Sequence, residues 1–381
     1  MNTESLRPDD VLRRAHAVGT YYGFTPFSAL AAARKGQKTR TPYPESVQLD
    51  ALDPVAKDVI GLLKQVRDIG ITPSAAKPLF VWHTNAAPGR TAPKTITLQF
   101  HAIGVDRPIA DAVLIRVARA LVKDIAKEEP VVRLNSMGDK ETRARFAREL
   151  GQFFRKHGTA LPPQCASCAK RDVIEAAEIA VREQVEEQVP AATNYLSEAS
   201  RKRFESLLEY LEETETPYEL ADDLLTRGTS WNETCFEISA GDAVRAWGSR
   251  YGEMTRPFFK SAVPSIVAHM RISLPAQAPV SPIKSPSRHR FVFVHIGDEA
   301  KRESIKLTDT LRRARIPLTQ AIGIESLTEQ IHFAETVNPK YLIVMGRKEA
   351  LDRSVILRER ATHTETFLPI DRLVEELKKI T

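Results

Sequence analysis

The sequence predicts an α+β protein built from two units. The first is an antiparallel sheet flanked by helices, and the second is a smaller α/β domain. The last third of the chain alternates short apolar runs with segments of helical length, starting with the run 291–296. Such alternation is typical of a mostly parallel sheet with helical cover. The front part instead contains period-two strands such as 95–100 among longer helical patterns. A proline- and serine-rich stretch, 275–289, lies between the two patterns and is too rich in proline for a packed core.

The domain organisation follows from that stretch. We expect a core at 1–274, a linker at 275–287 and a second domain at 288–381. The core is expected to carry a charged helical insertion at about 160–215. A chain of 381 residues also exceeds what one hydrophobic core usually supports, which favours at least two domains.

The elements of the first unit follow from apolar spacing and from turn residues. The helical period predicts helices at 1–23, 52–66, 109–125, 140–157, 173–188 and 197–213. Strands are predicted at 79–82, 95–100 and 131–135, and the segments 218–225 and 234–238 are expected to pair with each other. Ser197 has the position and chemistry of a helix N-cap.

The pattern in the second unit predicts strands and helices in alternation. Strands are predicted at 291–296, 317–321, 341–345, 355–357 and 367–368. Helices are predicted at 298–315, 326–336 and 371–380.

Composition narrows the class of protein. The apolar share of 42% and the charged share of 27% are ordinary for a globular chain. No apolar run reaches the roughly 18–20 residues that span a bilayer, and the amino terminus lacks the layout of a secretory signal, so we expect no membrane partner and a cytoplasmic location. The net charge of +6 favours a polyanionic partner without establishing one, because the basic residues are spread along the chain.

The cysteines predict neither a disulfide framework nor a metal site. Cys165 and Cys168 form a single C-x-x-C pair, and Cys235 lies far away in the sequence. Because a structural zinc site needs four ligands, we expect no metal and three reduced thiols.

Short segments in a fixed order carry a resemblance to a known family. In the last third these segments are 295–300, 311–316, 327–331, 344–349 and 355–362. In the first two thirds they are 99–106, 110–115, 134–138, 194–197, 226–237, 247–251 and 262–272. Together they resemble the histidyl type of class II aminoacyl-tRNA synthetase, with its anticodon-binding domain at the carboxyl end. In that family 247–251 would be a glycine-rich pocket turn and 262–272 would fall in motif 3.

The resemblance implies a homodimeric histidine–tRNA ligase that uses ATP and Mg²⁺ to activate histidine and transfer it to tRNA. Charge develops on the α-phosphate of ATP in this reaction, so fixed cations are needed there. The catalytic cation is implied to be Arg227, and the ATP-binding residues are Arg271 and Arg90. The implied substrate-binding residues are Asp106, Trp231, Arg250 and Tyr251. The implied tRNA-binding residues are Arg312, Arg313, Arg347, Lys348 and Arg358.

The chain departs from the family pattern at positions that matter for catalysis. Counting back from Phe100 places Pro88 or Gly89 where motif 2 begins with an arginine, and only a loop shift brings Arg90 there. Ala102 stands where the family has a glutamine for the substrate ammonium group. Each lost preorganised group commonly costs ~10²–10³ in rate. The alternative is therefore a non-catalytic paralogue, a possible pseudoenzyme, that binds tRNA or acts as a regulatory subunit. A third reading is a synthetase-like domain that joins another amino acid or acyl group to a different acceptor.

Several of these residues also have purely structural explanations. Arg271 could extend its stem from an apolar segment into water. His101 fits a packed strand position and Trp82 fits the core. Arg312 and Arg313 are most simply part of a solvated helix face.

Overall fold

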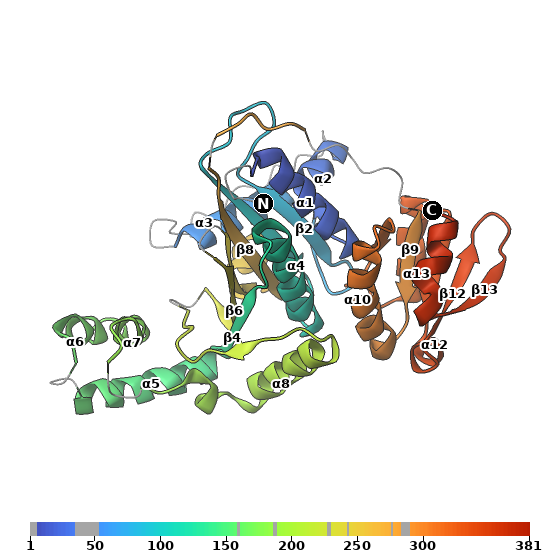
Figure 1. The fold of residues 1–381 in the computed structure, drawn as a ribbon. Coiled ribbons are helices and arrows are strands. Elements are labelled where there is room, and N and C mark those ends of the chain that lie inside the picture. The colour runs from blue at the N-terminus through green and yellow to red at the C-terminus, as the bar shows by residue number, and fades with distance from the viewer. Residues whose placement is uncertain are drawn as a thin grey trace.

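The chain folds around two separate sheets. The structure is a computed structural model, and it describes residues 6–34, 53–157, 161–185, 189–226, 230–241, 244–275, 277–282 and 290–381. One sheet is built from strands between residues 25 and 273, and the other from strands between 291 and 369 (Figure 1). The predicted fold class is confirmed, because the strand at 291–295 pairs in a different sheet from the strand at 95–103. The domain boundaries predicted from the sequence stay a proposal.

The first sheet has eight strands and is mainly antiparallel. Its order is β1 (Thr25–Pro26), β2 (Leu79–Thr84), β3 (Thr95–Ile103), β8 (Ser265–Ser273), β7 (Val244–Arg250), β6 (Asn232–Ala240), β4 (Val131–Ser136) and β5 (Glu219–Leu220). The short edge strands β1 and β5 pair parallel to their neighbours, and the other pairs are antiparallel.

One face of this sheet is apolar and is covered by helices. Helix α4 (Ile109–Ala126) contacts β3, β6, β7 and β8, and α1 (Pro8–Tyr21) packs beside it. Phe100, Phe236 and Met270 point to this side and are fully buried. Most of the α4 side chains are buried too, as expected for a helix that is apolar around most of its circumference. Burial of each such side chain stabilises the fold by about 1.5–3 kcal/mol.

The opposite face carries polar side chains in a continuous row. The strand register places His83, Gln99, His269, Trp247 and Glu237 side by side across five strands. Because side chains alternate along a strand, His101 lies on this same side, two residues from Gln99. We call this surface the polar face. Helix α3 (Pro54–Asp68), η4 (Gly252–Thr255) and α9 (Arg256–Phe259) pack over part of it through an apolar cluster.

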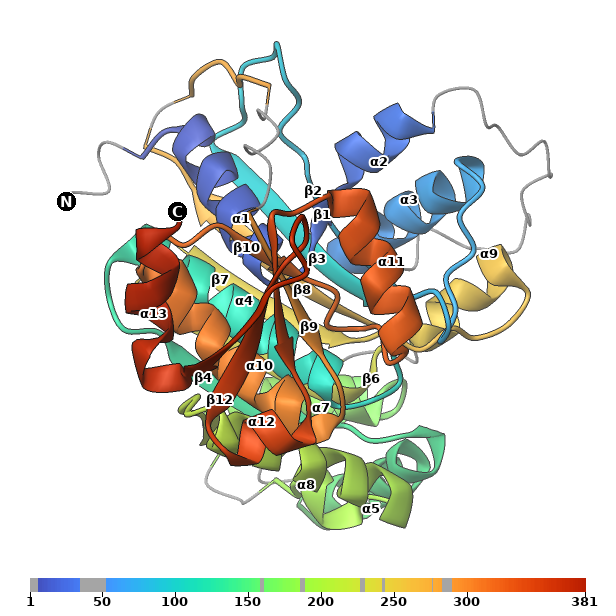
Figure 2. The same ribbon diagram turned by 90° about the vertical axis from the view of Figure 1, so that its right-hand side faces the viewer.

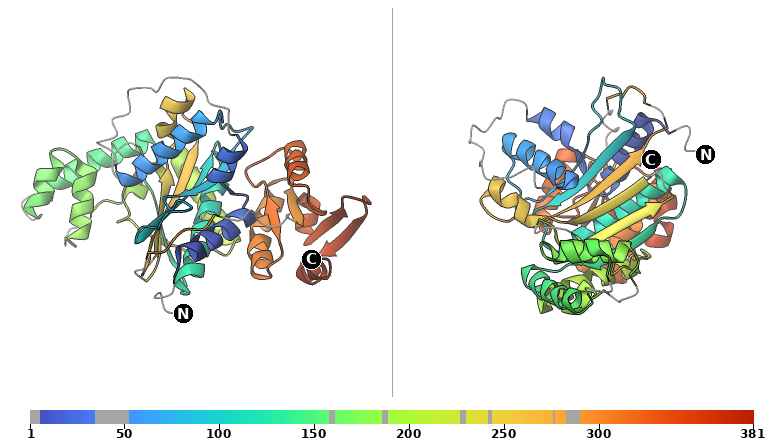
Figure 3. Two further views of the ribbon diagram at one scale, coloured as in Figure 1. Left: turned by 90° about the horizontal axis from the view of Figure 1, so that it is seen from above. Right: turned by 90° about the vertical axis from the view of Figure 1, so that its left-hand side faces the viewer.

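Further helices extend from the core. Helix α2 (Phe27–Ala33) follows β1, and the charged helical region comprises α5 (Lys140–His157), α6 (Pro163–Ala169), α7 (Val173–Arg182), η3 (Ala192–Tyr195) and α8 (Glu198–Glu213). Figure 3 shows α5, α6 and α7 projecting from one end of the core while the second sheet lies at the other end. The predicted N-cap is confirmed, since the Ser197 side chain accepts a hydrogen bond from the backbone N–H of Ser200.

The second sheet has five strands in the order β10–β9–β11–β12–β13. Its elements are β9 (Phe291–His295), α10 (Asp298–Arg313), β10 (Leu318–Gln320), α11 (Leu327–Val337), β11 (Tyr341–Met345), α12 (Arg347–Leu351), β12 (Ser354–Glu359), β13 (Glu365–Pro369) and α13 (Ile370–Lys379). Figure 2 views the molecule from the side of this domain. The sheet was expected to be mostly parallel, but β12 and β13 pair antiparallel, which their short connections allow.

Ion pairs join the second domain to the core. Arg107, just before α4, contacts Asp298 at 2.5 Å and Glu325 at 3.0 Å. Arg116 of α4 contacts Asp309 of α10 at 2.5 Å, and the Tyr22 hydroxyl donates to the same carboxylate at 2.6 Å. The loop that precedes α4 is therefore fixed to both units.

Three details of the predicted core are wrong. Segments 218–225 and 234–238 do not pair with each other, because β5 is only two residues long and pairs with β4. The helix predicted at 173–188 ends at Arg182, and Gln184 takes a left-handed conformation with φ of 52°. Segment 247–251 belongs mostly to strand β7 instead of a turn. Gly248 is required there by packing, since a Cβ would lie 2.2 Å from Cζ of Phe236.

Candidate ligand-binding site

Gln99 organises the centre of the polar face. Its Oε1 accepts hydrogen bonds from Nε2 of His83 at 2.8 Å and Nε2 of His101 at 3.1 Å. Its Nε2 donates to Nδ1 of His269 at 2.9 Å. The Tyr251 hydroxyl completes the network by donating to Nδ1 of His101 at 2.8 Å. An amide with two acceptor positions and two donors satisfies three rings at once when all three are neutral.

Burial keeps these histidines uncharged. It lowers the pKa of His83 and lowers that of His101 well below its usual value, and the nearby imidazoles add to the effect on His101. Burial also lowers the pKa of His269 to about 4, with smaller contributions from His83 and Arg271. At neutral pH the centre of the polar face therefore presents neutral hydrogen-bonding groups.

A small cavity of about 170 Å³ opens where β7 ends and β8 begins. Its walls come from the loop before α4, from α8, from the start of β6 and from η4, and they are mainly charged or polar. The lining residues are Asp106, Arg203, Asn232, Glu233, Arg250, Gly252, Glu253, Ala262, Pro264 and Ser265. We call this space the end cavity.

Arg250 holds one wall of the end cavity in place. Its Nε donates to both carboxylate oxygens of Asp111 at 3.0 and 3.1 Å, and its Nη2 also pairs with that carboxylate. Nη1 donates to the carbonyl of Val105 and Nη2 to the carbonyl of Arg107, each at 3.1 Å. Both charged side chains are almost fully buried. The arginine that was predicted to bind substrate thus fixes the loop that carries Asp106.

Asp106 and Glu233 place two carboxylates at the end cavity. Asp106 is largely exposed and is paired with Arg203 at 2.5 Å. Glu233 reaches the start of α8, where the Ser200 hydroxyl donates to its Oε1 at 3.1 Å. Burial raises the pKa of Glu233, and the neighbouring Arg203 only partly opposes that effect.

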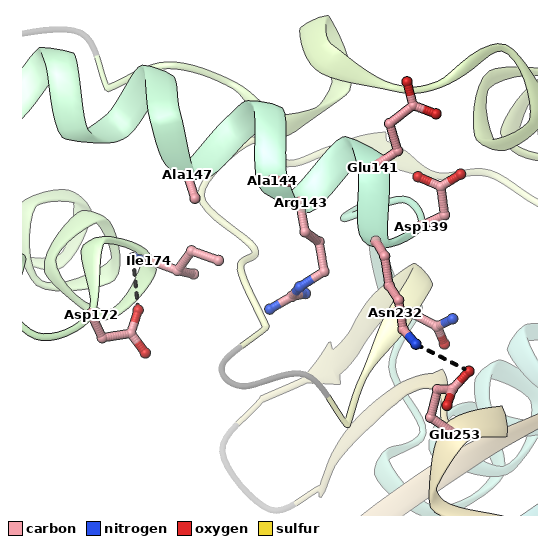
Figure 4. Close-up of a pocket in the computed structure, with 10 residues that line it drawn as sticks. Asp139, Glu141, Arg143, Ala144, Ala147, Asp172, Ile174, Asn232 and Glu253 are labelled. Atoms are coloured by element: carbon pink, nitrogen blue, oxygen red, sulfur yellow. Dashed lines mark hydrogen bonds and ion pairs between the residues drawn. The ribbon is translucent and has the colours of Figure 1, made fainter. Parts of the chain in front are cut away.

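A larger cavity of about 690 Å³ adjoins the end cavity, with which it shares Asn232 and Glu253. Arg143 points into it from α5, and Asp172 caps the start of α7 on the other side (Figure 4). Lys140 lies 3.7 Å from Glu253 at the boundary between the two spaces. The Arg143 guanidinium donates to the carbonyl oxygens of Thr226 and Trp231 at 3.2 Å.

The other predicted substrate residues are part of the core near the end cavity. Trp231 is buried, and its Nε1 donates to Asp53 Oδ2 at 2.9 Å. Tyr251 is fully buried and holds His101 as described above. Both aromatic rings pack in the cluster beneath α3, with a further edge contact between Trp231 and Trp247.

The predicted ATP-binding residues lie at the other end of the sheet. Arg271 is exposed on β8, and the six positions between it and Ser265 correspond to about 20 Å of strand. Arg90 is exposed in the loop after β2, where its carbonyl accepts from the backbone N–H of Val280. Arg227 lies outside the described residues. The structure thus does not bring Arg90 and Arg271 to the end cavity.

Ala102 faces away from the polar face. It is fully buried among the apolar side chains under α1 and α4, so the position does not contact the end cavity. The expectations that His101 and Trp82 are packed side chains are confirmed, since both are at most 1% exposed.

Sequence reasoning missed Glu233 and Arg203. Glu233 lies within the longer motif 226–237, and nothing in its sequence neighbours indicates a break in the strand register. The Asp106–Arg203 contact joins residues 97 positions apart and arises only when α8 packs beside the loop before α4.

The predicted tRNA-binding cations do not share one environment. Arg312 is mostly buried between the two units and pairs with Asp124 of α4 at 2.7 Å, so it is not part of a solvated face. Arg313 and Lys348 are exposed, and Arg347 is exposed beside Glu299 at 3.1 Å. Arg358 is partly exposed and donates to Nδ1 of His363 at 3.2 Å.

The described residues form neither a metal centre nor a membrane span. Within their ranges, no group of three or more His, Cys, Asp or Glu side chains is arranged to hold a metal ion. The three cysteines are buried and free. None of the described helices combines the length and the apolar character needed to cross a membrane.

Comparison with known proteins adds a family context. Residues 283–380 match the family described as "Anticodon binding domain". The chain is 27% identical over 287 residues to the histidine–tRNA ligase of Protochlamydia amoebophila, a match covering 73% of this chain and 68% of that protein. It is 28% identical over 274 residues to the histidine–tRNA ligase of Fervidobacterium nodosum, covering 68% of this chain and 64% of the relative. The apo histidyl-tRNA synthetase of S. aureus aligns with a TM-score of 0.44 and 17% identity, over 92% of this chain and 93% of that one.

Proposed function

Because this chain is a member of the histidyl-tRNA synthetase family, we propose that it is a synthetase-like protein that binds tRNA and does not activate histidine at an enzyme's rate. The observation that carries the proposal is the neutral centre of the polar face. His83, His101 and His269 are joined through Gln99 there, and burial disfavours the charged form of each ring.

Adenylate formation requires the opposite kind of surface. Attack on the α-phosphate of ATP builds negative charge, and preorganised cations must meet it. The described residues supply such cations only in part, since Arg271 lies on the polar face two residues from His269, whereas Arg90 lies in the loop after β2 and Arg227 is outside the described residues. Arg250, which lines the end cavity, already uses its Nε, Nη1 and Nη2 groups on Asp111 and two carbonyls.

Support for tRNA binding comes from the carboxyl-terminal domain. Its match to an anticodon-binding family covers nearly the whole domain. The exposed cations Arg313, Arg347 and Lys348, with the partly exposed Arg358, are available to phosphates, whereas Arg312 is engaged with Asp124. We propose these four residues as the RNA-contacting set. Family membership likewise supports a homodimer formed through the core, a cytoplasmic location and the domain division given above, all as proposals.

One preparation can test both halves of the proposal. Binding of a tRNA(His) transcript is measured on filters at 50 and 200 mM salt, and histidine attachment to the same transcript is measured in parallel. We expect salt-sensitive retention, because release of counterions makes affinity fall with salt, and no histidine attachment above background. If the filters retain no transcript at the lower salt concentration, the proposal that the protein binds tRNA is wrong. Efficient attachment would instead show a working ligase, with ATP, Mg²⁺ and histidine as its substrates and Arg227 as the first cation to test.

A further inference from the structure

We propose that a second cavity, at the β1–β2 edge of the eight-stranded sheet, binds an uncharged aromatic molecule that carries a hydrogen-bond acceptor. The cavity has a volume of about 590 Å³, within the roughly 300–1,000 Å³ typical of sites for small organic ligands. The residues that carry the argument are Leu12 and His16 of α1, Phe27 and Ala29 of α2, and Trp82 and His83 of β2. We call this space the edge cavity. The inference goes beyond the proposed function, because such binding requires neither tRNA nor ATP.

The edge cavity is separate from the end cavity. The strand register places Ile103 beside Leu79 of β2 and Ser265 of β8, so the end cavity lies at the end of the sheet where β2 begins. The edge cavity adjoins the other end of β2, at residues 82–84, on the outermost strands of the sheet. The two cavities share no lining residue within the described ranges.

A proline in the edge strand explains why the edge cavity forms. Strand β1 is two residues long, and Thr25 and Pro26 pair with Val81 and Trp82. Because proline has no backbone N–H, it cannot extend the hydrogen-bond ladder, and the chain enters α2 at Phe27. Helices α1 and α2 lie beside β2 (Figure 1), and the edge cavity occupies the space where a longer β1 would run.

Two adjacent rings at the edge cavity have nitrogen atoms without partners. Trp82 is 1% exposed, and its Nε1–H has no acceptor among the described residues. Both ring nitrogens of His16 are buried and likewise have no partner there, and the centroid of this ring lies 6.4 Å from that of Trp82. Trp82 also stacks on Phe100 at 5.8 Å, which holds its ring in place. Since buried polar groups are nearly always hydrogen-bonded, three such nitrogens beside one cavity indicate a ligand that brings the missing polar atoms.

The walls of the edge cavity select against charge. No Asp, Glu, Lys or Arg lines it within the described part of the chain. Burial lowers the pKa of His16 and that of His83, so both rings are neutral at neutral pH. A charged ligand would lose its hydration there without gaining a counter-ion, which costs free energy. The ligand is therefore uncharged.

The same walls define the other features of the ligand. The indole of Trp82 can only donate, so the ligand must present an acceptor, such as the carbonyl oxygen of an amide. Leu12 and Phe27 supply apolar surface, and the rings of Phe27, Trp82 and His16 offer edges and faces for contact with a flat ring. An aromatic amide combines both features.

The test uses three naphthalenes that differ in one substituent. 2-Naphthamide is uncharged and carries a carbonyl acceptor, 2-naphthoate is its anionic counterpart, and 2-ethylnaphthalene has no acceptor. Each is titrated into the full-length protein, and the indole N–H signals of its three tryptophans are followed by nuclear magnetic resonance. We expect 2-naphthamide to bind at least about tenfold more tightly than 2-naphthoate and to shift the Trp82 signal, which is assigned by its loss in Trp82→Phe. Equal or tighter binding of the naphthoate, no binding of the amide, or binding that leaves the Trp82 signal in place would overturn the proposal.

Variants test the location and the hydrogen bond separately. Ala29→Phe fills the edge cavity from α2 and should weaken 2-naphthamide about tenfold or more. Its matched control is Ala32→Phe, at an exposed position of the same helix outside the cavity lining, which should change the affinity by less than about twofold. An equal effect of the two alanine variants would contradict the location.

Trp82→Phe removes the N–H donor while keeping an aromatic ring. It should weaken 2-naphthamide about threefold or more and 2-ethylnaphthalene by less than about twofold, because only the amide accepts the hydrogen bond. Thermal unfolding verifies that each variant is folded. An equal loss for both ligands would contradict the role of the indole, whatever the outcome of the tRNA experiments.

Discussion

Removing Asp111 should destabilise the protein strongly, because Asp111 neutralises a buried arginine. Arg250 is only 4% exposed and Asp111 is fully buried. Asp111→Ala leaves the guanidinium in the core without its counter-ion, while its bonds to the carbonyls of Val105 and Arg107 remain. Breaking a buried pair in this way typically costs 3–5 kcal/mol, so we expect a loss of about 3–5 kcal/mol in the free energy of unfolding.

Urea unfolding followed by circular dichroism measures this loss. The matched control is Glu198→Ala, which breaks an exposed pair with Lys202 on α8 and should cost less than about 0.5 kcal/mol. The double variant Asp111→Leu/Arg250→Met should be more stable than Asp111→Ala, since it leaves no buried charge unpaired. A loss below about 1 kcal/mol for Asp111→Ala would refute the reasoning, because that value is typical of a solvent-screened pair.

Three other predictions concern pH, RNA and assembly. Because the pKa of His269 is about 4 in the folded protein and ordinarily 6.5, its contribution to stability is present above pH 6.5 and is lost as the pH falls towards 4. The loss in the free energy of unfolding amounts to about 3 kcal/mol by linkage. His269→Gln should therefore flatten the pH dependence of the urea unfolding midpoint between pH 6.5 and 4, and an unchanged slope would contradict this prediction. Arg347→Ala combined with Lys348→Ala should reduce the salt slope of tRNA binding by about 1 for each lost phosphate contact, whereas Lys57→Ala on α3 should not. Light scattering at micromolar concentration should give the mass of a dimer, and a monomer mass would remove the homodimer proposal.

The element pattern was predictable from local sequence, whereas strand partners were not. The alternation in 95–100 and the apolar spacing in 109–125 depend on neighbouring residues, and both elements formed as predicted. The partner of segment 218–225 depends on long-range pairing, which local patterns do not encode, and here the expectation was wrong. The sequence motif predicts a turn at Gly248, whereas the structure requires glycine there because of the ring of Phe236 on the adjacent strand.

The candidate site was likewise predictable only where it depends on local sequence. His101 could be recognised as a packed histidine, but its link through Gln99 to His269 requires the register of β3 with β8. Arg250 was found from a motif, and its partner Asp111 lies 139 residues away in the chain. The placement of the Glu233 side chain depends on a left-handed backbone conformation that the residue type at this position does not predict.

Histidine-dependent exchange of pyrophosphate into ATP tests the central claim most directly, because it reports adenylate formation without requiring tRNA. Purified full-length protein is assayed with each of the twenty amino acids, beside an active histidyl-tRNA synthetase as the positive control. The neutral histidines on the polar face and the engagement of Arg250 with Asp111 and two carbonyls predict no exchange above the background without amino acid. Robust exchange that requires histidine and is abolished in Arg227→Ala would contradict the claim and identify the chain as a working ligase.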